Sequence, residues 1–306
     1  GDVYKRQSLI PSSTEIIYSL GLGSKIIGRS HECDYPPHIR ILPFCTEPRF
    51  DINGNSLQID NNIKSLLQDA LSVFLIDEKK LNELKPDIII TQSQCEVCAV
   101  SLNDLEKAVE NIIGESPKIV STEPHSLDDV WKDILKIGIA LNVEKKAHSL
   151  IQKLKLRIQK LKSLTKGLNT PSVVCIEWIE PLMAAGNWVP ELVKLANGIN
   201  LIGSRGEHSP WIDIKKVVDQ NPDKIIIMPC GYNIEKTESE MSSLTKVKEW
   251  SSLRAVQNNQ VYITDGNQYF NRPGPRLIDS LEILVEIIHN QKYNFGHENI
   301  GWKKFL

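Results

Sequence analysis

The stretch LNELKPDIIIT, residues 81–91, joins a helical run to a Lys-Pro-Asp turn and three consecutive isoleucines. Proline cannot continue the helix, and the isoleucine run predicts a strand that is buried on both faces. The same pattern returns as VVDQNPDKIIIM at residues 217–228. This repetition predicts two related α/β units in one chain.

A second pair of segments supports two related halves. SLGLGSKIIGRS at 19–30 is similar to KLANGINLIGSR at 194–205, and both predict a helix, a Gly stop, a short strand and a Gly turn. Both pairs occur in the same order, although chance is an alternative for segments this short. Short β-rich runs alternate with helical runs along the chain, as in parallel sheets covered by helices. The predicted strands are 7–10, 25–29, 72–76, 87–91, 117–121, 172–178, 224–229 and 260–264.

One long amphipathic helix is predicted between the halves. In NVEKKAHSLIQKLKLRIQKLKSLTKG, apolar residues recur every three or four positions from Val143 to Leu164. Such a helix, from 143 to 166, would be ~36 Å long, and we expect it to hold two lobes at a nearly fixed separation. The predicted organisation is an N-terminal lobe at 7–124, linking helices at 125–168 and a C-terminal lobe at 169–306.

The composition excludes several classes of protein. The 306 residues are 41% hydrophobic and 24% charged, with a formal net charge of −2. There is no basic excess to attract nucleic acid or an anionic membrane, and the apolar runs fall short of the ~20 residues of a membrane-spanning helix. The first residues, GDVYKRQ, contain no initiating Met and no apolar segment, so we expect a cytoplasmic location. A periplasmic or cell-surface location stays open if the native start is missing.

Candidate ligand contacts follow the predicted strands. Ligands of open parallel sheets bind beyond the carboxyl ends of the strands. After the first strand, Ser12 and Glu15 have the spacing of a capping box at an exposed helix start. Polar and aromatic groups collected in this way suit a large, flat, partly polar ligand, although packing alone would explain any single one of them. The candidates are Ser12, His31, Glu32, Gln94, Trp178, Trp188, His208, Trp211, Asn267, Tyr269, Phe270 and Arg272.

The cysteines allow three interpretations. A chain with an ample core needs no disulfide scaffold, so unpaired thiols are the simplest one. Cys95 and Cys98 could also form a redox pair. A closed zinc site would need two further ligands. The six cysteines are Cys33, Cys45, Cys95, Cys98, Cys175 and Cys230. The candidate metal ligands are His31, Cys33, Cys95, Cys98, His208 and Cys230.

Several segments together resemble the cobalamin-binding branch of the class III substrate-binding proteins of ABC importers. They are SLIPSSTEIIYSLGLGSKIIGRSHECDYP, TQSQCEVCAVS, EWIEPLMAAGNW, HSPW, PCGY and DGNQYFNRPGPRL. The resemblance implies an α/β fold of two Rossmann-like lobes with parallel sheets, a long rigid helix between them and a ligand cleft. The elements HECDYP and QCEVC depart from the better-known secreted receptors.

The resemblance implies a binding protein rather than an enzyme. The expected ligand is cobalamin or a related corrinoid, and the chain has no cofactor of its own. The expected role is ABC-type uptake, with ABC importer membrane subunits as partners, or intracellular handling of the corrinoid. We expect a monomer that binds no nucleic acid. We also expect a histidine, His208 before His31, to ligate the corrin metal. The alternatives are a metal-binding protein or metalloenzyme that uses the His/Cys cluster, and a thiol redox enzyme that uses Cys95 and Cys98.

Overall fold

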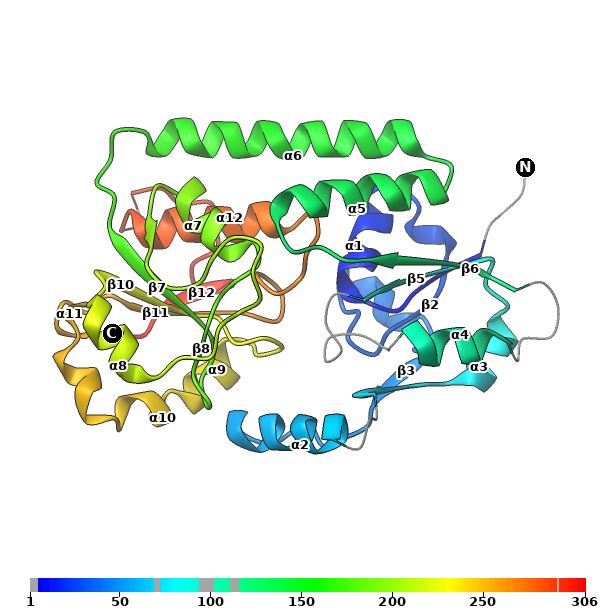
Figure 1. The fold of residues 1–306 in the computed structure, drawn as a ribbon. Coiled ribbons are helices and arrows are strands. Elements are labelled where there is room, and N and C mark those ends of the chain that lie inside the picture. The colour runs from blue at the N-terminus through cyan, green and yellow to red at the C-terminus, as the bar shows by residue number, and fades with distance from the viewer. Residues whose placement is uncertain (1–4, 69–71, 94–101, 111–115, 291) are drawn as a thin grey trace. The chain divides into compact units, whose positions relative to one another are not determined.

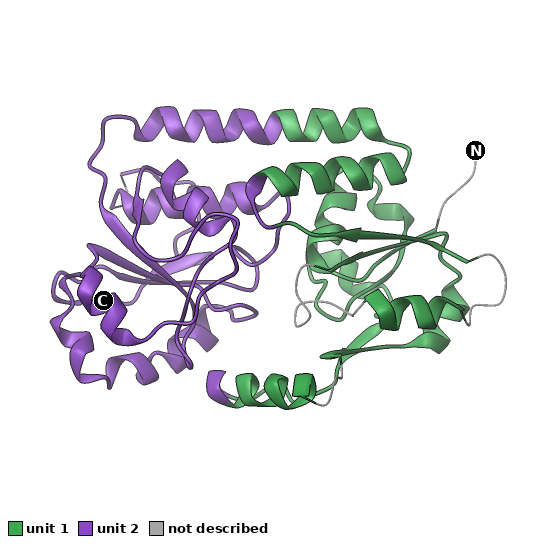
Figure 2. Ribbon diagram, viewed as in Figure 1, with its two compact units in different colours: residues 1–54, 58–124, 128–152 green, residues 55–57, 125–127, 153–306 purple. Residues whose placement is uncertain are grey.

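The computed structural model describes residues 5–68, 72–93, 102–110, 116–290 and 292–306. Within these, the chain divides into two compact units, which Figure 2 shows in separate colours. Unit 1 consists of residues 1–54, 58–124 and 128–152, and unit 2 of residues 55–57, 125–127 and 153–306. Each unit has its own sheet and its own hydrophobic core.

Unit 1 is built on a four-stranded parallel sheet with the order β2-β1-β5-β6 (Figure 1). Its strands are β1 (Arg6–Ser8), β2 (Ile26–Arg29), β5 (Ile88–Gln92) and β6 (Lys118–Thr122). A separate antiparallel pair is formed by β3 (Thr46–Pro48) and β4 (Phe74–Ile76). The first helices of the chain are α1 (Pro11–Ser19), η1 (Gly23–Lys25), η2 (Pro37–Ile41), α2 (Ser56–Gln68), α3 (Glu78–Leu84), α4 (Leu102–Glu110) and α5 (Leu127–Ala140).

Unit 2 has a six-stranded sheet with the order β12-β11-β10-β7-β8, and β9 pairs with β7. The strands β7, β10 and β11 run parallel, whereas β8 and β12 are antiparallel to their neighbours. The strands are β7 (Ser172–Trp178), β8 (Met183–Ala184), β9 (Ile199–Asn200), β10 (Lys224–Ile227), β11 (Val261–Thr264) and β12 (Trp302–Lys304). The helices are α7 (Val189–Leu195), α8 (Ile214–Gln220), α9 (Ile234–Glu240), α10 (Ser242–Thr245), η3 (Lys248–Ser252), α11 (Arg254–Gln257) and α12 (Leu277–Ile288).

The two repeated segments fold alike. Helices α3 and α8 are followed by the C-cap residues Lys85 and Asn221, and both have left-handed backbone conformations, with φ of 46° and 40°. A Pro-Asp pair follows each of them and leads into the isoleucine strand, β5 or β10. The isoleucines of both strands are buried, as the unbroken apolar runs predict.

The predicted long helix is one continuous element. Helix α6 (Glu144–Thr165) has 22 residues, and its first part belongs to unit 1 and its remainder to unit 2. In unit 1 the helix lies close to α5, because a Cβ on Gly138 would be 2.5 Å from the Cβ of Ala147. In unit 2, Leu154, Ile158 and Leu161 are buried. The apolar stripe therefore packs into both units.

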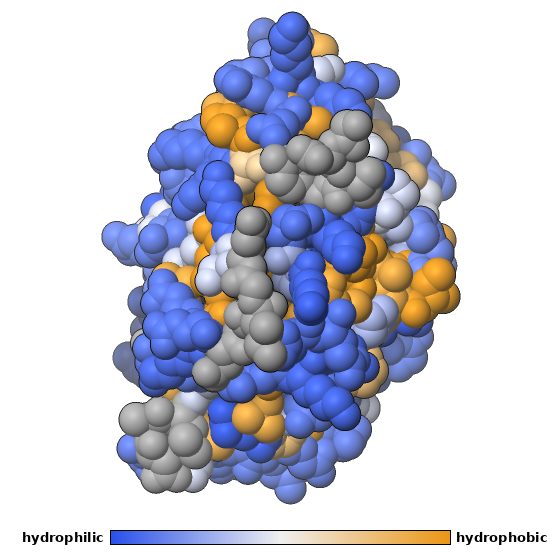
Figure 3. All heavy atoms as spheres, turned by 90° about the vertical axis from the view of Figure 1, so that its right-hand side faces the viewer, coloured by the Kyte–Doolittle hydropathy of each residue, from blue (hydrophilic) through white to orange (hydrophobic). Residues whose placement is uncertain are grey.

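One face of the protein is mostly polar. Figure 3 shows a face on which hydrophilic residues predominate and hydrophobic ones are scattered between them. Among the residues described, no helix combines the length and the hydropathy that crossing a membrane requires.

Candidate functional site

Loops at the carboxyl ends of the unit 2 strands are hydrogen-bonded to one another. The N–H of Cys230, after β10, donates to the carbonyl of Glu177 in β7 (3.2 Å). The N–H of Asn267, after β11, donates to the carbonyl of Tyr232 (3.0 Å). The Nδ2 of Asn271 donates to the carbonyl of Met228 (3.1 Å). The loops that follow β7, β10 and β11 therefore form one connected surface at the edge of the sheet where ligands of this fold class bind.

Two glycines allow a fourth segment to join this surface. A Cβ on Gly186 would lie 2.5 Å from the carbonyl oxygen of Glu207, and a Cβ on Gly203 would lie 2.1 Å from that of Ala185. Gly203 also has φ of +88°, a conformation that favours glycine. The segments AAGNW and GEHSPW thus lie backbone against backbone, and the N–H of Asn187 donates to the carbonyl of Glu207 (2.7 Å).

This close approach fixes a carboxyl group. The Oγ of Ser209 donates to the Oε2 of Glu177 (2.9 Å) and accepts a hydrogen bond from the N–H of Gly186 (3.0 Å). Ser209 is buried, with 3% of its surface exposed, and Glu177 is half-buried. Burial raises the pKa of the Glu177 carboxyl, and the Ser209 hydrogen bond, nearby His208 and the Gly186 N–H oppose that rise. Neither Glu177 nor Ser209 is among the ligand contacts predicted from the sequence.

The segments that carry Glu177 and Ser209 also carry aromatic side chains. The rings of Trp178 and Tyr232 are 5.2 Å apart, and the Nε1 of Trp178 donates to the carbonyl of Glu180 (3.1 Å). Trp211 is 54% exposed and forms a β-bridge with Met183. Trp178 and Trp211 thus keep accessible aromatic surface.

Two other predicted contacts lie in the core instead. Trp188 is 5% exposed and Phe270 is 1% exposed, and the Nε1 of Trp188 donates to the carbonyl of Phe270 (2.6 Å). In this structure they pack beneath the loops and join the segment before α7 to the loop after β11. We therefore assign them a supporting role in place of the predicted ring contact.

The two arginine side chains of the loop 265–276 are hydrogen-bonded within that loop. Arg272 is 6% exposed, and its Nη2 donates to the Oδ1 of Asn267 (3.0 Å). Arg276 donates to the Oε1 of Gln268 (3.0 Å), and its guanidinium lies 4.8 Å from the ring centre of half-buried Tyr269. Arg272 was predicted to contact the ligand, but burial gives it a role in shaping the loop.

The predicted unit 1 contacts also follow strands. Ser12 is buried in α1, and the helix N-cap is Ile10, without a side-chain hydrogen bond. The predicted capping box is therefore wrong, because Pro11 occupies the first helical turn and moves the helix start ahead of Ser12. Glu32 is exposed after β2. Gln94, Cys95 and Cys98 lie outside the residues that the structure describes.

The two candidate metal-ligating histidines differ in environment. His31 is half-buried, its Nδ1 lies 2.8 Å from the Oγ1 of Thr46, and its ring packs on Phe74 with centres 4.9 Å apart. Burial lowers the pKa of His31 to about 4, so its imidazole is neutral at pH 7. His208 is exposed, with its Nδ1 3.0 Å from the carbonyl of Ser209. Each ring has one nitrogen engaged, which orients the other.

The described cysteines give no metal cluster. Cys45 and Cys175 are buried free thiols whose pKa values are raised by burial, that of Cys45 to about 11. Cys33 is buried and its Sγ accepts a hydrogen bond from the Oγ1 of Thr14 (3.1 Å), while Cys230 is exposed. Within the described part of the chain, no group of three or more His, Cys, Asp or Glu could hold a metal ion.

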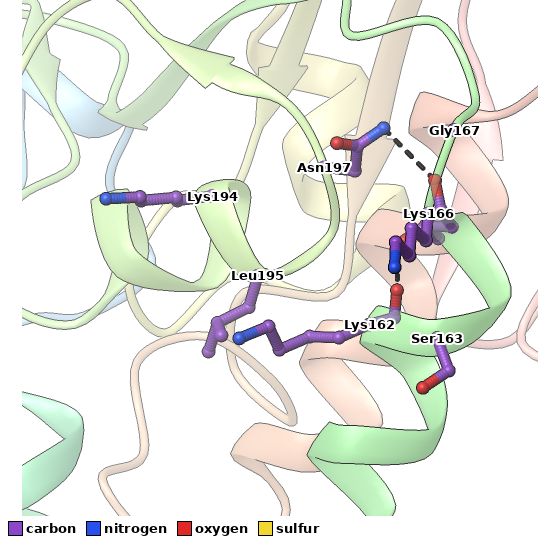
Figure 4. Close-up of a pocket in the computed structure, with 8 residues that line it drawn as sticks. Lys162, Ser163, Lys166, Gly167, Lys194, Leu195 and Asn197 are labelled. Carbon is purple, nitrogen blue, oxygen red and sulfur yellow. Dashed lines mark hydrogen bonds between the residues drawn. The ribbon is translucent and has the colours of Figure 1, made fainter.

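Two surface hollows lie away from the strand ends just described. One of about 360 Å³ lies where α6 and α7 end, and Figure 4 shows the lysine side chains and Asn197 that line it. The Nδ2 of Asn197 donates to the carbonyls of Thr165 and Leu168 (both 3.2 Å), so it caps the end of α6. The other, of about 460 Å³, lies along β6 and α5 in unit 1. Neither contains the predicted contacts.

Comparison with known proteins decides the family. The protein family described as "Periplasmic binding protein" matches residues 8–268 of this chain. The chain belongs to the periplasmic binding protein family. This family consists of substrate-binding proteins for transport and not of enzymes, and its members in ABC importers work with membrane transporter subunits. The predicted two-lobed α/β fold and the resemblance are thereby confirmed.

Individual relatives differ in ligand. An uncharacterized ABC transporter substrate-binding lipoprotein, YvrC of Bacillus subtilis, is 26% identical over 92% of this chain and 79% of its own length. The vitamin B12-binding protein of Vibrio cholerae is 26% identical over 90% of this chain and 85% of its own. The periplasmic heme-binding protein RhuT from Roseiflexus, in apo form, has the same fold, with a TM-score of 0.71 and 19% identity over 94% of this chain and 98% of its own.

The predicted cytoplasmic location is wrong. Members of this family are periplasmic or lipoprotein substrate-binding proteins, which work outside the cytoplasm. The prediction rested on the first residues of the sequence, and these do not determine the compartment of a family member.

Proposed function

We propose that this periplasmic binding protein carries cobalamin or a related corrinoid to the membrane subunits of an ABC importer. The vitamin B12-binding protein of Vibrio cholerae, similar over most of both chains, supports this ligand class. A binding protein of this kind needs no cofactor of its own, and the corrinoid is its cargo.

The observation that carries the proposal is the composition of the connected loop surface of unit 2. Trp178 and Trp211 offer flat apolar area there, and Glu177, Asn267 and the exposed imidazole of His208 offer hydrogen bonds beside it. A corrin ring is flat and apolar in its plane and carries polar amides around its rim. Aromatic area together with a few fixed polar groups is the arrangement that such a ligand requires.

Haem or another iron chelate is the second candidate. It is favoured by the fold similarity to a haem-binding protein and by the neutral imidazole of His31, since neutral imidazole is a good ligand for iron. Under either candidate, one of the two histidines is the proposed axial ligand, and His208 is preferred to His31. For aquacobalamin, we expect a shift of the visible bands that is lost in one of the variants His208→Ala and His31→Ala.

Isothermal titration of the purified protein with cyanocobalamin, dicyanocobinamide, haemin and a ferric hydroxamate siderophore tests the proposal. We expect a corrinoid to saturate the protein at one molecule per chain and the siderophore to give no binding heat. Saturation by haemin without binding of either corrinoid would replace the proposal with the second candidate.

A metal-binding protein is the remaining alternative, and it depends on Cys95 and Cys98. Metal analysis of the protein after dialysis tests it. We expect less than stoichiometric zinc and iron. One tightly held metal ion per chain that is lost in Cys95→Ser would overturn this expectation.

A further inference from the structure

We propose that Glu177 makes the site selective for ligands whose rim carries uncharged amides over ligands whose rim carries carboxylates. This inference rests on the proposed corrinoid function and concerns the same site. Glu177 would make the protein bind an amide-bearing corrinoid in preference to an acidic tetrapyrrole.

The carboxyl group of Glu177 is held in one position. It lies near the end of β7, its Oε2 accepts the hydrogen bond from Ser209, and Ser209 is itself fixed by the N–H of Gly186. Because the backbones around Gly186 and Glu207 are in contact, this arrangement has little freedom to turn away from a ligand. Trp178, the next residue in the strand, keeps accessible ring surface.

The cations around this surface are already engaged. Arg272 and Arg276 are hydrogen-bonded within their own loop, and Lys236 pairs with Glu240 (3.2 Å). In the portion of the chain that the structure describes, Glu177 forms no ion pair with Lys or Arg. The positive influence on it comes from the exposed imidazole of His208.

These facts decide between the two ligand types. A carboxylate placed beside a half-buried carboxyl group costs free energy, because one of the two must take up a proton or remain as a like-charge pair. An amide avoids this cost, since its N–H donates to the ionised form of Glu177 and its carbonyl accepts from the protonated form. A site can therefore reject acidic ligands by this one group.

The test compares cyanocobalamin with its monocarboxylic acids, in which one rim amide has been hydrolysed. For the parent protein at pH 7.5, we expect at least one of these acids to bind about tenfold more weakly than cyanocobalamin, the size of one charge-assisted hydrogen bond. In Glu177→Gln, which retains an acceptor for Ser209, this difference should fall to about twofold or less. Glu180→Gln, in the same loop, should keep it.

The outcomes separate this inference from the proposed function. If cyanocobalamin does not bind the parent protein, the corrinoid function fails. If cyanocobalamin binds, but the parent shows no preference over any of the acids, or Glu177→Gln keeps the preference of the parent, the role of Glu177 is wrong. Thermal melts of each variant confirm that the folded protein is being compared.

Discussion

The carboxylate of Asp223 accepts two hydrogen bonds from Ser172, one from its N–H (2.8 Å) and one from its Oγ (2.7 Å). Asp223 follows Pro222 in the turn before β10, and Ser172 begins the neighbouring strand β7. Asp87, at the same place in the first repeat, accepts a hydrogen bond from the N–H of Lys5, just before β1. Both halves of the chain thus use the Pro-Asp turn to tie two adjacent strands together.

Replacing Asp223 should destabilise the protein. Asp223→Ala removes the acceptor of both Ser172 bonds and of the Arg254 ion pair (2.9 Å). Hydrogen bonds to charged groups contribute about 1.5–3 kcal/mol each, and partial exposure reduces that here, so we expect a loss of about 2 kcal/mol. Urea denaturation measures it. Asp219→Ala, which loses an exposed pair with Lys215, is the control and should change stability by less than about 0.5 kcal/mol. Equal losses of unfolding free energy in the two variants would contradict a stabilising link between Asp223 and Ser172.

His31 should make stability depend on pH in the acid range. Its folded pKa of about 4 lies below the ordinary value near 6.5, so between these values the unfolded chain takes up a proton that the folded chain does not. The unfolding free energy should therefore fall as pH is lowered from about 6.5 to 4. With partial exposure taken into account, we expect about 1–3 kcal/mol from this group.

The comparison with His31→Gln isolates this contribution. Denaturation at a series of pH values should give a flatter curve for the variant than for the parent, with the difference confined to the interval from pH 4 to 6.5. Parallel curves over that interval would show that the imidazole titrates normally in the folded protein.

Gly186 should be indispensable to the site for steric reasons alone. In Gly186→Ala the new Cβ would overlap the carbonyl of Glu207, so the two segments must separate and the Ser209 bond to Glu177 must lengthen. We expect a loss of stability of at least about 1–3 kcal/mol and at least about tenfold weaker ligand binding. Gly206→Ala is the control, because it meets only the dihedral cost of a positive φ and has open space around it. If Gly186→Ala binds ligand as tightly as the parent, the close approach of the Gly186 and Glu207 backbones does not control the site.

Truncation of Trp211 should weaken ligand binding, whereas truncation of Trp188 should lower stability. Trp211→Ala removes a half-exposed ring, so ligand affinity should fall about tenfold or more while stability changes by less than about 1 kcal/mol. Trp188→Ala opens a buried cavity and should cost about 3–5 kcal/mol in unfolding free energy. Thermal melts and ligand titration of both variants check this pair. Loss of stability in Trp211→Ala with unchanged affinity would remove that ring from the site.

Local patterns predicted most of the fold. All eight predicted strands are present, and the helix expected at 143–166 is α6 at Glu144–Thr165. Isoleucine runs and three-to-four periodicity report burial directly, so they locate such elements. The prediction missed β3, β8, β9 and β12, which have two or three residues each. Such short strands exist because a neighbour pairs with them, and their own sequence carries little signal.

The site was less predictable because it depends on contacts across the sequence. Glu177 has its role through Ser209, 32 residues away, and no local pattern links them. Trp188 and Phe270 come after strands, as a ligand contact would, but tertiary packing buries them. The spacing of Ser12 and Glu15 suggested a cap, whereas Pro11 sets the helix start. The sequence did offer one indication, the glycines at positions 186 and 203, because a glycine often occurs where another backbone approaches closely.

The shared helix α6 restricts how this gene can vary. Each residue added to an α-helix turns everything after it by about 100° and advances it by about 1.5 Å. An insertion between Ala147 and Leu154 would therefore point the buried side chains of one unit away from their core while those of the other stayed in place. Loops can lengthen or shorten during evolution without this penalty. We therefore expect insertions and deletions within α6 to be selected against as strongly as the loss of a catalytic residue in an enzyme.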